Sequence, residues 1–99
     1  MASVALPGRR TGALLVRPIA DREVIRAFLE RDRLYAAYAI CDLEDREFAR
    51  TRWAAAHAGD ELVAIVLEYG GLSPQPVFVM GRSDGIEAIL RTLIRPRAA

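Results

Sequence analysis

The spacing of apolar residues at the start of the chain predicts a strand followed by an amphipathic helix. The apolar run Ala13–Arg17 predicts a short strand that ends at Pro18, because proline cannot donate a hydrogen bond to a sheet. Asp21 then occupies the position of a helix N-cap. Apolar residues at helical spacing predict that this helix runs to about Asp32. These residues are Val24, Ile25, Phe28 and Leu29.

The middle of the chain predicts a second helix, a charged connection and a β-hairpin. Alanine-rich Leu34–Cys41 favours a helix, and the charged segment 42–50 predicts a loop or one helical turn anchored by Phe48. Two strands are expected at Arg52–His57 and Leu62–Tyr69, on either side of a short polar turn. The second of these strands is β-branched and almost continuously apolar, so both of its faces are expected to be covered.

The last third predicts one more strand and a final helix. Glycine and proline residues between 70 and 76 indicate a turn, Val77–Met80 a strand, and Asp84–Leu93 an amphipathic helix. The resulting order, β-α-α-β-β-β-α, predicts an α+β fold in which helices pack on a mostly antiparallel sheet of about four strands. One edge of such a sheet lacks a cover. We expect a single domain over residues 13–95, between a flexible tail at 1–12 and a short tail at 96–99.

Composition excludes several classes of function. The 99 residues suffice for one small domain, and a net charge of +1 gives no basic face for nucleic acid. No apolar run has the length of a membrane span, and the order of the N-terminal residues is wrong for a secretory signal. A cytoplasmic protein is therefore expected. Cys41 is the single cysteine, so an internal disulfide is excluded, and its apolar neighbours predict a packed thiol.

The polar turn before the last helix carries the most specific chemistry. The residues Arg82-Ser83-Asp84-Gly85-Ile86-Glu87 join the predicted strand Val77–Met80 to that helix. Backbone N–H groups at a helix N-terminus lack intrahelical partners and lie at the positive end of the helix dipole. A diphosphate can bind there when the backbone is accessible.

This turn and the order of the elements resemble the N-terminal half of GNAT-family N-acetyltransferases. In that family the turn reads Gln/Arg-x-x-Gly-x-Gly/Ala, which Arg82 and Gly85 match and Glu87 does not. The resemblance covers about residues 14–94. It implies acetyl transfer from acetyl-CoA to an amine, with Val79, Met80, Arg82 and Gly85 at the cofactor. It also implies that the helical region with Tyr35 and Tyr38 borders the acceptor groove, although core or rim packing explains the two tyrosines as well.

The departure at Glu87 leaves two interpretations of the turn open. A carboxylate at this position would repel a diphosphate, and Asp84 adds a second negative charge. Asp84 and Glu87 also have the spacing of a capping box, in which each side chain accepts from a backbone N–H at the helix start. We favour the capping box over a working cofactor loop. The cofactor is then acetyl-CoA by resemblance, or none.

The resemblance also implies that the family's later strands and helices, which close the cofactor site, are missing from this sequence. We expect a truncated or half domain that is inactive alone, like the degenerate first domain of a tandem GNAT protein. The alternative is a non-catalytic α+β module. In that case the exposed sheet edge pairs with a second copy, giving a homodimer, or with a second GNAT-like domain.

The remaining candidate residues favour structural roles, and none can be assigned as catalytic. His57 is the single histidine, so neither a catalytic triad nor a His-pair metal site can be built, and it is expected at the surface beside a turn. Trp53 is expected under the first helix. The acidic residues of the 42–50 segment could hold an amine or a hard metal ion, but interleaved arginines favour a solvated, ion-paired segment, and we expect no metal. These acids are Asp42, Glu44, Asp45 and Glu47.

Overall fold

A computed structural model of the chain describes residues 9–11, 13–70 and 76–92. Its elements follow the order β1 (Arg9–Thr11), β2 (Leu14–Pro18), α1 (Arg22–Leu29), the 3-10 turn η1 (Glu30–Asp32), α2 (Ala37–Cys41), α3 (Asp45–Phe48), β3 (Thr51–Ala58), β4 (Glu61–Tyr69), β5 (Val77–Gly81) and α4 (Ser83–Thr92). The α+β class and the order β-α-α-β-β-β-α are confirmed, and α3 is the helical turn expected around Phe48.

The sheet is an antiparallel meander in the order β1-β2-β3-β4-β5. The four expected strands are β2 to β5, and β1 adds a fifth within the segment expected to be a flexible tail. The pairs Arg9↔Val16, Arg10↔Leu15 and Thr11↔Leu14 join this segment to β2, so it is an edge strand rather than part of a flexible tail. Four expectations lie wholly or partly outside the described residues: the tail over 1–8 and 12, the turn through 71–75, the end of the last helix at Leu93 and the tail at 96–99.

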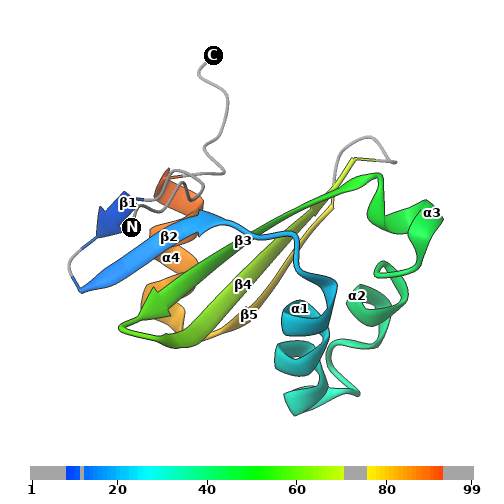
Figure 1. Cartoon of the computed structure of the whole chain (residues 1–99), viewed down its shortest axis with the longest axis horizontal. Coiled ribbons are helices and arrows are strands. Elements are labelled where there is room, and N and C mark those ends of the chain that lie inside the picture. Colours follow the sequence, from blue (N-terminus) through cyan, green and yellow to red (C-terminus); the bar gives the residue numbers. More distant parts are fainter. Residues whose placement is uncertain (1–8, 12, 71–75, 93–99) are drawn as a thin grey trace.

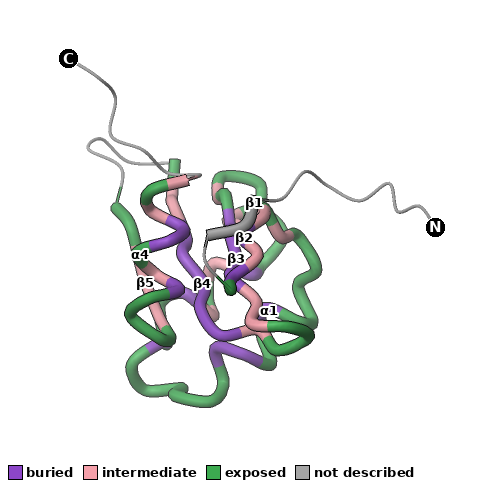
Figure 2. Tube along the Cα trace, turned by 90° about the vertical axis from the view of Figure 1, so that its left-hand side faces the viewer, coloured by how far each residue is buried: buried purple, intermediate pink, exposed green. Residues whose placement is uncertain are grey.

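The helices cover opposite faces of the sheet (Figure 1). Helices α1 and α2 pack on one face, where Ile25, Leu29, Trp53 and Ile65 form a buried cluster. Helix α4 packs on the other face, where it completes a second cluster through Ile89. The middle of β4 is buried throughout (Figure 2), as its almost continuous apolar run predicts, and Trp53 lies under α1 as expected.

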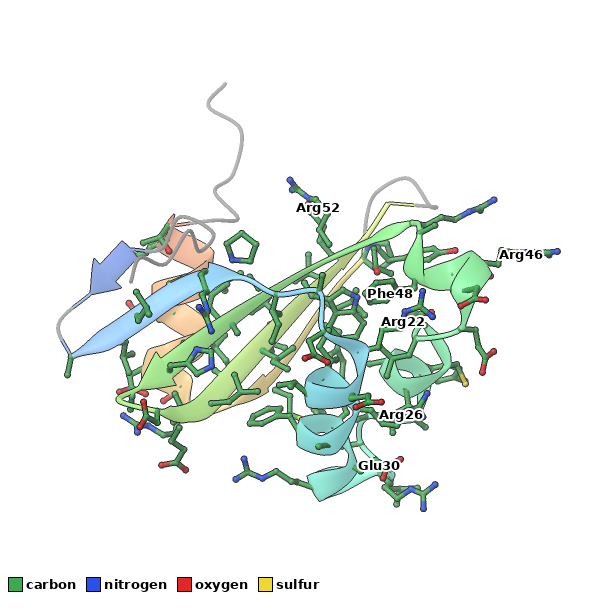
Figure 3. All side chains as sticks on the ribbon, viewed as in Figure 1. Arg22, Arg26, Glu30, Arg46, Phe48 and Arg52 are labelled. Atoms are coloured by element: carbon green, nitrogen blue, oxygen red, sulfur yellow. The ribbon has the colours of Figure 1, made fainter. Side chains whose placement is uncertain are left out.

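Local signals in the sequence explain where α1 begins and how α3 is attached. The Asp21 side chain accepts from the backbone N–H groups of Glu23 and Val24, which confirms the predicted N-cap. The Arg22 guanidinium lies 4.4 Å from the centre of the Phe48 ring and forms an ion pair of 2.6 Å with Asp45 (Figure 3). These contacts hold the charged 42–50 segment against the first helix. No helix in the described part of the chain is long and apolar enough to cross a membrane.

Candidate functional site

The predicted phosphate-binding turn lies between the last strand and the last helix, as expected. Val79, Met80 and Gly81 end β5, and Arg82 is the single residue before α4 begins at Ser83. The Arg82 N–H donates to the Val63 carbonyl at 2.9 Å, and its own carbonyl accepts from Ile86 at 3.0 Å. The Arg82 N–H thus makes the last backbone hydrogen bond to β4, and the Arg82 carbonyl is the first hydrogen-bond acceptor of the helix.

The side chain of Arg82 is engaged by Asp84. Its Nε and Nη2 donate to the two carboxylate oxygens at 3.1 and 2.7 Å. These hydrogen bonds lower the pKa of the Asp84 carboxyl and raise the pKa of the Arg82 guanidinium, since both charged forms are stabilised. Both side chains are more than half exposed, so water screens the pair. A bound diphosphate would compete with Asp84 for this guanidinium.

The predicted capping box does not form. Helix α4 begins at Ser83, which makes Arg82 the N-cap, so Asp84 and Glu87 lie two positions too far into the helix to act as N-cap and N3 residues. Gly81 has a φ of +119°, which turns the chain out of β5 and lets the helix start this early. Glu87 instead accepts a 2.5 Å hydrogen bond from Arg91, one turn further along. Its carboxylate is exposed beside the helix start rather than folded back onto it.

Gly85 has a packing role that needs no ligand. It is buried, and a Cβ built at this position would lie 2.8 Å from the Cβ of Ala64 and 3.4 Å from that of Ala56. A glycine here therefore lets the first turn of α4 approach β3 and β4 closely. Gly85, the glycine that matches the family's turn sequence, therefore faces the sheet.

The outer edge of β5 carries backbone groups that no other described strand pairs with. Arg82 donates to Val63 of β4, and Pro76 accepts from Tyr69 of β4 at 3.1 Å. Since residues of an antiparallel strand alternate between the two sides, Val77, Val79 and Gly81 direct their N–H and C=O groups away from β4. In the described part of the sheet β5 is the end strand, so these groups form a free edge that leads directly to the start of α4.

A groove of about 620 Å³ at the end of this edge brings together most of the residues predicted at the site. Val79, Met80 and Arg82 line it from β5 and the turn, and Tyr35 lines it from the segment before α2. Gly85 is absent from the lining, consistent with its position against the sheet. We call this cavity the β5 groove. Its polar side chains are Arg31, Asp32, Tyr35, Glu61 and Arg82.

No family model, curated protein or solved structure matches this chain.

The two tyrosines do not share one surface. Tyr35 precedes α2, whereas Tyr38 lies within it, so the helical spacing assumed from the sequence is interrupted between them. Tyr35 lines the β5 groove, and Tyr38 lines a second cavity of about 440 Å³ together with Val77 and Phe78. Tyr38 is 88% exposed. Of the predicted pair, Tyr35 alone contributes to the groove beside the cofactor turn.

A β-bulge at Val63 shapes the groove, and the sequence did not reveal it. The pairing of β3 with β4 changes register between Ala56↔Ala64 and His57↔Leu62, which leaves Val63 as the extra residue. The bulge places the Val63 side chain in the α4-side cluster and its carbonyl at the N–H of Arg82. The continuous apolar run of β4 hides this change of side, because every residue in it is apolar.

Two of the other expectations are wrong in detail. Cys41, the last residue of α2, is exposed rather than packed. His57 is half-buried rather than at the surface, and its Nδ1 has no hydrogen-bond partner among the described residues. Burial lowers the pKa of His57, and the charge of Arg17 lowers it further. His57 does not line the β5 groove.

The acidic residues of the 42–50 segment act separately. Asp45 pairs with Arg22, and Glu47 accepts a 2.6 Å hydrogen bond from the Tyr69 hydroxyl. Burial and the nearby Glu47 raise the pKa of Asp42. The described residues hold no group of three or more potential metal ligands. The predicted ion pairing holds for Asp45, although its partner comes from α1 and Arg52 pairs with Glu68 instead.

Proposed function

We propose that this chain is a GNAT-like module of the N-acetyltransferase type, with the site for acetyl-CoA at the β5 groove. The observation that carries the proposal is the continuity between a free strand edge and a helix N-terminus. The outward backbone groups of Val79 and Gly81 lead to Arg82 and the first turn of α4 within one groove. The resemblance of the turn and of the element order supports the same assignment.

Each part of the groove has a function in this proposal. The outward N–H and C=O groups of Val79, and of Val77 further along the same edge, would hydrogen-bond the amides of the pantetheine arm, as a neighbouring strand would. The first N–H groups of α4 and the guanidinium of Arg82 would face the diphosphate. The bound cofactor would supply the activated acetyl group for transfer to an amine. No residue of this chain is assigned as the catalytic acid or base.

The local charges limit how tightly the chain alone can bind. Asp84 occupies the guanidinium of Arg82 with two hydrogen bonds, and the exposed carboxylate of Glu87 lies on the same first turns of α4. Both acids oppose a diphosphate at the helix start. We therefore propose that the module is degenerate and contributes little acetyl transfer by itself.

Replacing Glu87 by glycine is expected to increase the affinity for coenzyme A by about fivefold, since a carboxylate near a helix N-terminus contributes up to about 1 kcal/mol. The wild-type chain should bind only at millimolar concentrations. Calorimetric or NMR titration with coenzyme A measures both. Pantetheine, which lacks the diphosphate, should show no gain in the variant.

Glu87→Gln is the matched variant, because it removes the charge and keeps the length of the side chain. An equal gain for glutamine and glycine would assign the effect to charge, and a gain for glycine alone would assign it to access to the backbone. Unchanged coenzyme A affinity in both variants would contradict the proposed position of the diphosphate. Sub-millimolar binding by the wild-type chain would show instead that the turn is not degenerate.

A second candidate function is a non-catalytic module that pairs through β5. The exposed side chains beside the free edge favour it: Tyr35, Tyr38 and Val77 are three of the five exposed large apolar or aromatic residues in the described chain. An edge flanked by apolar side chains is a template for another strand. The partner would be a second copy of this chain or a catalytic GNAT-like domain.

Val77→Pro tests this second function, because proline is tolerated at the first residue of a strand but removes an outward N–H. If β5 pairs with a second copy, we expect the dissociation constant of the dimer to rise about tenfold through lost edge hydrogen bonds. Sedimentation equilibrium measures it, with Val77→Ala as the control that keeps the N–H. A wild-type chain that is folded and monomeric at all concentrations would exclude self-pairing.

A further inference from the structure

The Tyr35 hydroxyl is hydrogen-bonded to the edge of β5, where the cofactor would bind. It donates a 2.8 Å hydrogen bond to the carbonyl of Val79, one of the outward-facing groups of β5. The two residues are far apart in the chain, so this contact is tertiary. A hydrogen bond to an outward carbonyl in the middle of a free edge satisfies a group that any pairing partner would need.

The ring of Tyr35 also covers the edge from one face of the sheet. Its centre lies 5.3 Å from that of Phe78, whose side chain packs on the α1-side cluster. Tyr35 remains 56% exposed, so the ring is held by this tilted contact with Phe78 and by the hydrogen bond rather than by burial. A side chain held by so few contacts can leave its place at low cost.

We propose that Tyr35 is a latch that closes the middle of the β5 edge and that must release Val79 before the edge is used. The Tyr35 hydroxyl and an incoming amide then compete for the outward side of the Val79 carbonyl, and the tyrosine has to move away before a ligand can lie along the strand. Ligand affinity is reduced by the fraction of molecules in which the latch is closed. Tyr35 is a positioning residue in this scheme and takes no part in acetyl transfer.

The latch differs from the charges at the turn in what it controls. Asp84 and Glu87 act on the diphosphate, whereas Tyr35 acts on the segment of cofactor that lies beside the strand. The two effects are therefore expected to be independent, and a double variant at positions 35 and 87 should show the product of the single gains. This assignment to a cofactor segment rests on the proposed function, but the closed edge itself does not.

Tyr35→Phe is the direct test, because it removes the hydroxyl and keeps the ring on Phe78. We expect coenzyme A and pantetheine to bind about fivefold more tightly to this variant than to the wild-type chain, the factor that corresponds to one hydrogen bond. Tyr38→Phe is the control, since the described residues offer its hydroxyl no hydrogen bond and it lies outside the β5 groove. NMR titration that follows the amides of Val79, Gly81 and Arg82 reports the affinity and its location.

Equal affinities of the wild-type chain and Tyr35→Phe for both ligands would overturn the latch. If neither ligand binds any variant, the proposed cofactor site is wrong. The latch is then tested by measuring how strongly each variant self-associates through the free edge. In that case a dimer of Tyr35→Phe about fivefold tighter than that of Tyr38→Phe supports the latch. No difference between the two variants in sedimentation equilibrium would overturn it.

Discussion

Replacing Gly81 by alanine is expected to lower the free energy of unfolding by about 3 kcal/mol or more, the largest effect of any substitution considered for this chain. A Cβ at this position would lie 2.3 Å from the Val63 carbonyl oxygen and 2.7 Å from the Cα of Ala64. Both are backbone atoms of β4, which pairs with β3 on one side and β5 on the other, so neither can move without disturbing the sheet. The φ of +119° adds a backbone strain that glycine does not have.

Gly59→Ala is the matched control for this prediction. Gly59 also has a positive φ, of 64°, but a Cβ there would meet nothing within 4 Å. Gly59→Ala should lower the free energy of unfolding by about 1 kcal/mol, because only the strain of a positive φ opposes the alanine. Urea unfolding followed by circular dichroism measures both. Equal losses of stability in the two variants would show that the close approach of Gly81 to the bulge at Val63 is not what requires glycine.

Replacing Gly85 by alanine should destabilise the chain by about 1–2 kcal/mol, although alanine is the better helix former. Overpacking typically costs about 1–3 kcal/mol, and the gain in helix propensity offsets up to about 1 kcal/mol of it. The new Cβ would lie 2.8 Å from that of Ala64, so α4 would have to move away from β4. The same denaturant titration measures the loss.

The double variant with Ala64→Gly decides whether packing is the cause. With the opposing Cβ removed, Gly85→Ala should become neutral or slightly stabilising, which gives a coupling energy of at least about 1 kcal/mol between the two positions. The same loss of stability in both backgrounds would contradict the packing role. A large change in coenzyme A affinity without a change in stability would instead support the position at the cofactor that the family resemblance implies for Gly85.

Sequence periodicity predicted the secondary structure well because most elements have one uniform pattern. The helix after Asp21 and the hairpin of β3 and β4 are encoded by local spacing and capping, and both form within a few residues of the expected positions. Strand β1 was missed because a three-residue strand is too short for any period. The exposure of Cys41 was missed because apolar neighbours in sequence do not lie on the same face of a helix.

The candidate site was predictable in its parts and not in its assembly. Arg82, Val79 and Met80 were recognisable because the turn is contiguous in sequence. The contact of Tyr35 with Val79 joins two distant segments, and nothing local to either residue indicates it. The role of Gly85 was ambiguous for a different reason, since a close approach to a phosphate and a close approach to a sheet require the same missing Cβ.

The order of strands in the sheet has a consequence for how the chain folds. Every strand pairs with its neighbour in sequence, so the pairings β1–β2, β3–β4 and β4–β5 need little ordering of distant segments. One pairing, β2–β3, closes a long loop, the segment 19–50 that contains α1, α2 and α3. Loop closure is the entropic step that slows the formation of such contacts. We therefore expect the closure of this loop, with the docking of its helices onto β3 and β4, to limit the folding rate, because the meander from β3 to β5 consists of contacts between neighbours in sequence.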